Sequence, residues 1–168
     1  MPEVRVDLLT SVVAAFEAFS ATVYPDPVGK PTIGFGHLLK AGEYFPAAIT
    51  REEGLALLDS DLRVARASVD DLFHGVYLAP NEWDALTSFV FNVGAEALRT
   101  STLRQRVLTG MGAGAAHEFV RWVHATMPDG TKKKLPGLVR RRDCESCWFL
   151  GAHPATVARM AGAVPEDD

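Results

Sequence analysis

Two carboxylates near the start of the chain have the types and spacing needed to cut a glycosidic bond. Glu17 lies in a run of apolar residues, and Asp26 follows nine positions later in a stretch rich in proline and glycine. Glycoside hydrolysis needs a protonated acid at the leaving oxygen and a second carboxylate that acts on the anomeric carbon, directly or through water. Partial desolvation beside Phe16 and Phe19 would favour the protonated form of Glu17, whereas Asp26 on a polar turn should stay ionised.

Thr32 supplies a third polar group near Asp26. It stands six positions past Asp26, across a predicted tight turn, where its hydroxyl could help hold a water molecule against that carboxylate. Residue types alone do not establish a catalytic role, because a Glu beside the apolar stripe of a helix is commonly a surface residue and an Asp before proline is commonly a turn former. The three residues are therefore a hypothesis that the rest of the chain must support.

Hydrophobic periodicity predicts the elements that would position these groups. Apolar residues recur at helical spacing over residues 8–19, which predicts an amphipathic helix that carries Glu17 beside its apolar stripe. That helix must end before Pro25, and residues 26–29 have turn chemistry. Residues 32–37 are typical of a short glycine-rich strand, so a small β-hairpin should follow the first helix.

The remainder of the chain predicts mainly helices. A capping box at residues 50–53 begins a long helix that runs to about residue 74, long enough to connect two lobes. The sequence therefore predicts an α+β, predominantly α-helical protein of one domain over residues 1–168, with a helix-and-hairpin lobe (about 1–50), an interlobe helix (about 50–74) and a helical lobe (about 75–168). Shorter helices are expected at residues 80–93, from 101 or 102 to near 110, and at 115–125, 136–151 and 154–163, with a turn at 128–130.

Composition argues against several functional classes. The chain is 48% hydrophobic with a formal charge of −4, and it has no run of about 20 apolar residues that could span a bilayer. Its first residues lack the order of a signal peptide, so synthesis in the cytoplasm is expected. The basic runs at 132–134 and 140–142 lack interleaved aromatic residues and are expected to form a solvated face rather than a nucleic-acid site. Cys144 and Cys147 form a C-x-x-C pair, but they fall in an apolar helical pattern, which disfavours a redox pair or half a zinc site.

The segment around Glu17 resembles the catalytic segment of the phage-type lysozymes, or endolysins, of glycoside hydrolase family 24. Residues 16–19 and 24–37 carry the likeness, with Glu, Asp and Thr at matching spacing. Ala18 and Pro31 depart from the usual pattern, but neither is a reacting group. The likeness continues in the same order through residues 50–53, 85–94, 101–103 and 137–145.

The resemblance implies a two-lobe lysozyme-like fold and hydrolysis of the β-1,4 bond between N-acetylmuramic acid and N-acetylglucosamine in bacterial peptidoglycan. Glu17 would be the general acid, and Asp26 with Thr32 would position and activate water in an inverting reaction that needs no cofactor or metal. It further implies a monomeric, bacteriolytic phage enzyme for host cell lysis, without stable membrane insertion. Such an enzyme would act on the cell wall in the periplasm after release through a separate membrane-hole protein. Delivery inside a virion is the alternative route, which would look the same in the sequence.

The same resemblance implies roles for five further residues. His37 could be a general base because histidine titrates near neutral pH, but a structural ion pair with Asp61 on the long helix is the preferred role. Phe91 and Asn92 match positions at the cleft floor that contact substrate, and Leu38 is a further candidate. Packing in the core is the alternative for Phe91.

The three tryptophans and the arginine run at residues 140–142 have simpler expected roles. The three tryptophans fall on apolar helical faces and are expected to pack rather than to bind sugar. Helical geometry points the side chains of residues 140–142 in different directions, so at least one arginine should pack or pair near the cleft while another is solvated. The tryptophans are Trp83, Trp122 and Trp148.

Two other functions compete with a hydrolytic muramidase. A lytic transglycosylase retains the acid but forms an anhydro sugar without water, and the presence of Asp26 and Thr32 argues against it. A catalytically inactive wall-binding or structural phage protein could use the same fold, because fold alone does not secure activity. Retention of all three catalytic residue types favours the enzyme.

Overall fold

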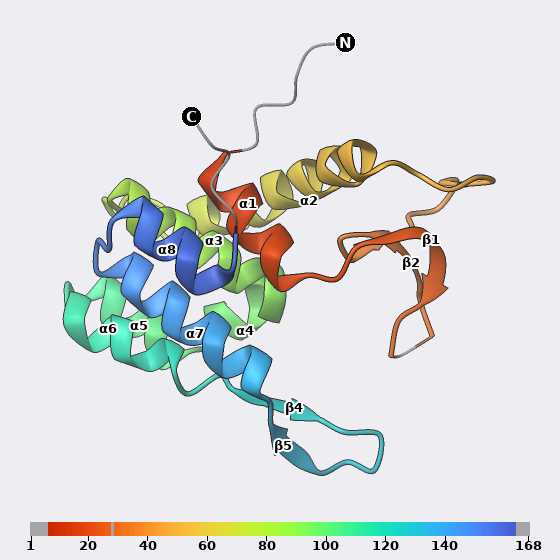
Figure 1. The fold of residues 1–168 in the computed structure, drawn as a ribbon. Coiled ribbons are helices and arrows are strands. Elements are labelled where there is room, and N and C mark those ends of the chain that lie inside the picture. Colours follow the sequence, from red (N-terminus) through yellow and green to blue (C-terminus); the bar gives the residue numbers. More distant parts are fainter. Residues whose placement is uncertain (1–6, 28, 164–168) are drawn as a thin grey trace.

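The computed structural model describes residues 7–27 and 29–163, which form eight helices and two small antiparallel sheets (Figure 1). The predicted α+β, predominantly helical class is confirmed. Across these described residues, no helix combines the length and the apolar character needed to cross a bilayer. The elements in chain order are α1 (Leu8–Phe16), β1 (Ser20–Pro25), β2 (Pro31–Gly34), β3 (His37–Leu38), α2 (Arg51–Leu72), α3 (Pro80–Val93), α4 (Ala95–Arg99), α5 (Thr102–Leu108), α6 (Gly112–Phe119), β4 (His124–Thr126), β5 (Lys132–Lys134), α7 (Pro136–Phe149) and α8 (Pro154–Ala161).

Helix α1 is shorter than its sequence periodicity predicts. Asp7 caps its first turn, and the helix ends at Phe16, so that Glu17 is the C-cap with extended backbone angles of φ −97° and ψ 137°. The prediction that Glu17 lies within the helix was therefore wrong by one residue. The apolar pattern continues to Phe19 for another reason: that ring packs against Phe35 in the turn between β2 and β3, with centroids 5.1 Å apart.

Strands β1, β2 and β3 form an antiparallel sheet in that order. A tight turn joins β1 to β2, in which the backbone N–H of Lys30 donates to the Asp26 carboxylate (2.8 Å) and the N–H of Asp26 donates to the Lys30 carbonyl (2.9 Å). The structure thus contains the hairpin predicted after the first helix. It also adds the short strand β3, which pairs Ile33 with His37.

Helix α2 connects this sheet to the remaining helices (Figure 1). It begins with the predicted capping box, in which the Thr50 hydroxyl accepts from the Glu53 N–H (3.1 Å) and the Glu53 carboxylate accepts from the Thr50 N–H (2.7 Å). Its 22 residues give a length of about 33 Å. Its buried face recurs at helical spacing, with Leu58, Leu62, Ala65, Val69 and Leu72.

Helix α3 forms the centre of the helical part and packs against both α2 and α7. Phe89 of α3 is fully buried and meets Phe119 and Trp122 edge-on, with centroids 5.3 and 5.4 Å away. Trp148 is also buried, and the Trp83 indole donates to Asp70 on α2, so all three tryptophans have packing partners.

The helix predicted at residues 115–125 was misplaced. Helix α6 spans Gly112–Phe119, and the chain then turns so that His124–Thr126 forms β4, paired with β5. The apolar residues at 119, 122 and 123 do face the interior, but a turn supplies that geometry in place of a helix. The lysines of β5 are exposed, as expected for a solvated face.

Gly54 is a point at which α2 lies close to Phe19, Gly34 and Phe35. A Cβ built there would lie 2.6 Å from Cε2 of Phe19. Alanine gains about 0.5–1 kcal/mol over glycine inside a helix, but overpacking typically costs about 1–3 kcal/mol. We therefore expect Gly54→Ala to lower the free energy of unfolding by about 1–2 kcal/mol, as measured by urea denaturation. Gly112→Ala is the matched control, because a Cβ there meets nothing within 4 Å. Equal stability of the two variants would contradict the prediction.

Candidate active site

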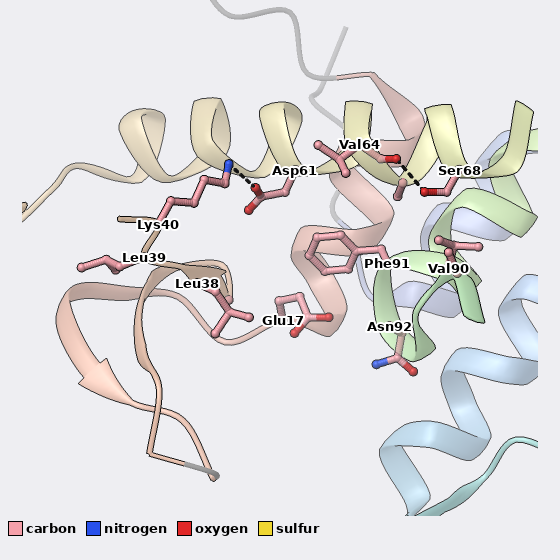
Figure 2. A pocket seen from close by; sticks show the side chains of 13 residues that line it. Glu17, Leu38, Leu39, Lys40, Asp61, Val64, Ser68, Val90, Phe91 and Asn92 are labelled. Atoms are coloured by element: carbon pink, nitrogen blue, oxygen red, sulfur yellow. Dashed lines mark hydrogen bonds and ion pairs between the residues drawn. The ribbon is translucent and has the colours of Figure 1, made fainter. Parts of the chain in front are cut away.

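A cavity of about 590 Å³ lies where the sheet region meets α2 and α3. Its wall contains five of the residues singled out from the sequence, and Figure 2 shows them arriving from four separate parts of the chain. The lining mixes apolar and polar side chains, which suits a sugar because its faces pack against apolar groups and its edges form hydrogen bonds. The five residues are Glu17, Leu38, Asp61, Phe91 and Asn92.

Glu17 lies at the junction of two hollows. It lines the larger cavity and also a second one of about 450 Å³ that extends along the start of α7. Its side chain is 25% exposed, and its Oε1 accepts a hydrogen bond of 2.5 Å from Nη1 of the buried Arg141. Its Oε2 lies beside Gly36, where a Cβ would come within 3.8 Å of it. Oε1 of Glu17 is thus paired with the guanidinium of Arg141.

The arginine run at residues 140–142 divides as the sequence predicted. Arg140 is exposed, whereas Arg141 and Arg142 are buried, and Arg141 reaches the cleft carboxylate. The guanidinium of Arg141 also stands over the ring of Phe16, 5.4 Å from its centroid. Sequence reasoning placed one arginine near the cleft but did not identify which one pairs with Glu17.

Asp26 and Thr32 lie together on the β1–β2 hairpin. The Lys30 carbonyl accepts from both the Asp26 N–H (2.9 Å) and the Thr32 hydroxyl (3.1 Å), so one oxygen holds both residues. Thr32 is buried on β2, opposite Tyr24 of β1. Neither Asp26 nor Thr32 is part of the wall of the cavity at Glu17, which the chain reaches only after β2, at Gly36 and Leu38.

His37 is held between two carboxylates. Its Nδ1 lies 2.7 Å from Asp61 of α2, the partner expected from the sequence, and its Nε2 lies 2.9 Å from Glu43, which sequence reasoning missed. A carboxylate only accepts hydrogen bonds, so both ring nitrogens donate when His37 is protonated. Burial lowers the pKa of His37, but the hydrogen bonds and charges of Glu43 and Asp61 outweigh it, and the net pKa is raised.

Glu43 also fixes the loop after β3. Its carboxylate accepts from the Lys40 N–H at 2.8 Å as well as from His37, and these hydrogen bonds lower the pKa of Glu43. Lys40 in turn lies 3.7 Å from Asp61 (Figure 2). These contacts tie one edge of the cavity to α2.

The cysteine pair lies on α7, as the apolar pattern predicted. Burial raises the pKa of the Cys144 thiol to about 12, which keeps it protonated and unreactive. Within residues 7–27 and 29–163, no group of three or more His, Cys, Asp or Glu side chains is arranged to hold a metal ion.

A predominantly helical fold with a small antiparallel sheet, and a carboxylate at the cavity where the two meet, defines a lysozyme-type glycoside hydrolase. The model of the phage lysozyme family matches residues 14–145. An endolysin of Acyrthosiphon pisum secondary endosymbiont phage 1 is 34% identical over 143 residues, which cover 84% of this chain and 94% of the relative. The chain belongs to the phage lysozyme family, as its sequence motifs predicted.

Two solved structures share this fold. An endolysin from Escherichia coli O157:H7 phage FAHEc1 superposes with a TM-score of 0.78 at 28% identity and covers 90% of this chain and 96% of its own. The muramidase domain of SpmX from Asticaccaulis excentricus has a TM-score of 0.77 at 33% identity, with 87% and 97% covered. The chain is thus similar to lysozymes of phage and of bacterial origin.

The raised pKa of His37 makes stability depend on pH. A histidine whose pKa is higher in the folded state stabilises the fold fully below its unfolded pKa of about 6.5, and this contribution is lost as pH rises through the folded value. We expect the free energy of unfolding to fall as pH rises from about 6.5, the unfolded pKa, through the raised pKa of the folded state, and to fall less in His37→Gln. Urea denaturation across this range tests it. His74→Gln, which changes an exposed histidine, should retain the wild-type slope.

Proposed function

We propose that this lysozyme hydrolyses the β-1,4 bond between N-acetylmuramic acid and N-acetylglucosamine in peptidoglycan, with inversion. The observation that carries the proposal is the position of Glu17, whose carboxylate faces the cavity between the sheet and α3 while Arg141 holds one of its oxygens. The names of its relatives, endolysin and muramidase domain, support the same substrate.

Glu17 is the general acid in this proposal. Arg141 has only donors, so Oε1 must accept from it and the transferable proton belongs on Oε2. Gly36 leaves room beside Oε2, at the wall of the cavity. When the bond breaks, Oε2 delivers its proton to the leaving sugar oxygen.

Asp26 and Thr32 orient the attacking water. The Thr32 hydroxyl donates its hydrogen to the Lys30 carbonyl, so the hydroxyl oxygen of Thr32 can accept a hydrogen bond. A water molecule can then donate one hydrogen to Thr32 and the other to the Asp26 carboxylate. As the water oxygen bonds to the anomeric carbon, Asp26 takes up one proton, which balances the proton released by Glu17.

Leu38, Phe91 and Asn92 contact the sugar in this proposal. Leu38 is 46% exposed at one wall, and Phe91 and Asn92 lie opposite it at the end of α3 (Figure 2). Phe91 also packs against the core, so both roles considered for it apply. A structural rather than catalytic role for His37 agrees with its two carboxylate partners.

The biological setting follows from this chemistry. We propose that the enzyme lyses bacterial walls during phage release. Its monomeric state and its passage through a separate membrane-hole protein stay predictions.

Replacing the acid tests the function. We expect wild-type protein to release reducing muramic ends from purified peptidoglycan, and Glu17→Gln to lower the rate by about 10²–10⁴-fold, because glutamine cannot supply the proton. Borohydride reduction and mass spectrometry identify the ends. Glu52→Gln, an exposed change on α2, is the control and should retain wild-type activity.

The products separate the competing functions. Anhydro ends from the wild type would assign the chain to the lytic transglycosylases. Binding to the wall without any cleavage would leave a lysozyme fold used for recognition alone.

A further inference from the structure

Three charged side chains of α7 are buried together behind the active site. Arg141 is 3% exposed, and Arg142 and Glu145 are completely buried. Charged residues are almost never fully buried unless they are paired, because removing a charge from water costs more than most contacts return. A cluster of this kind next to Glu17 therefore calls for a specific explanation.

Glu145 is the centre of the cluster. Its Oε1 accepts from Arg141 Nε (3.2 Å), from Arg142 Nη2 (3.1 Å) and from the Ser88 hydroxyl (2.7 Å). Its Oε2 lies 2.9 Å from Arg142 Nε. One carboxylate thus holds both guanidinium groups against α3.

Arg141 is fixed at every nitrogen. Nε donates to Glu145, Nη2 donates to the backbone carbonyl of Ser88 (3.3 Å), and Nη1 donates to Glu17. A planar guanidinium held at two of its nitrogens has one orientation left for the third. The direction of the hydrogen bond to Glu17 is therefore set by Glu145 and by α3.

Arg142 fixes the orientation of Asn92, a second residue in the wall of the cavity. Its Nη2 donates to Oδ1 of Asn92 at 3.0 Å. A guanidinium has only donors, so it determines which end of the amide faces it and leaves Nδ2 to donate into the cavity. Figure 2 shows the Asn92 oxygen turned toward α7 and the nitrogen turned toward the Glu17 side.

We infer that Glu145 and Arg142 are positioning residues, which hold Arg141 against the acid and Asn92 as a donor aimed at a carbonyl oxygen of the sugar's N-acetyl group. The inference rests on the proposed function. It makes a single buried carboxylate responsible for both the orientation of the acid and one contact that selects an acetylated sugar.

The cluster also sets the charge that the acid experiences. Arg141 and Arg142 with Glu145 carry a net charge of +1, which the ionised Glu17 neutralises. Arg140 over Phe16, and Lys40 and Asp61 across the cavity, are the other charged groups that face this region. Removing the charge of Glu145 raises the net charge of the cluster from +1 to +2, which leaves excess positive charge beside Glu17.

Glu145→Gln tests the positioning role, because glutamine keeps the size of the side chain but loses its charge. We expect kcat on peptidoglycan to fall about 10²-fold and the basic limb of the pH profile to move to lower pH. Glu118→Gln is the matched control: Glu118 is a second buried carboxylate, 3.1 Å from Arg106 and 3.3 Å from Arg121, on α6. This control should lose stability but keep the wild-type kcat and pH profile.

Arg142→Lys tests the second arm. Lysine retains the positive charge beside Glu145 but lacks the planar fork that also reaches Asn92. We expect KM to rise about tenfold with little change in kcat, because one hydrogen bond to the sugar is lost. Asn92→Ala should have a similar effect, and the double variant should be no worse than either one, since both remove the same contact.

The outcomes separate this inference from the proposed function. If the wild type cuts the wall but Glu145→Gln has the same kcat and pH profile as Glu118→Gln, the inference alone is overturned. A wild type that releases no muramic ends would overturn the proposed function and the inference with it. If Glu145→Gln does not fold, Ser88→Ala removes one hydrogen bond to Glu145 without changing buried charge. A several-fold loss of kcat in Ser88→Ala would support the inference, and wild-type kcat would overturn it.

Discussion

The burial of Glu145 between two arginines is the interaction on which the active site depends. A charge in the interior is tolerable only when it is paired and hydrogen-bonded, and removing one partner leaves an uncompensated charge. Glu145 meets this condition with Arg141, Arg142 and Ser88. These contacts join α7 to α3, and the same Arg141 then reaches Glu17 just after α1. Glu17 is thus attached to the helical core through Arg141 and the buried contacts of Glu145.

The cleft has a second fixed edge on the side of the sheet. His37 joins the end of β2–β3 to α2 through Asp61, and to its own loop through Glu43. Because α2 packs against β2 and β3 and also against α3, it links the sheet to the helical part. The two edges are held by different chemistry. One is a buried cluster of paired charges, and the other is a histidine whose pKa is raised by its two carboxylate partners.

The sequence predictions failed where two physical effects give the same pattern. Phe19 continues the apolar spacing of α1, but it packs across the sheet region on Phe35, so periodicity placed Glu17 inside the helix and not at its C-cap. Phe119, Trp122 and Val123 face the interior from the end of α6 and the turn after it, which mimics a helical face, and the hairpin β4–β5 was missed for this reason. Contacts made over long sequence separations, such as Glu17 with Arg141, leave no local signal. Glu43 was missed because a polar loop residue carries no mark of its partner.

The sequence by itself determined the helical class, the long capped helix and the membership of the phage lysozyme family. Capping boxes, prolines and apolar periodicity act over a few residues and can be recognised locally. The spacing of Glu17, Asp26 and Thr32 identified the family, and the family model confirms that assignment. Only the tertiary structure decided which arginine holds the acid, which way Asn92 presents its amide and which carboxylates clamp His37. Each of these depends on the packing of α7, α3 and α2 against one another, and that packing is set by the whole core rather than by any one segment.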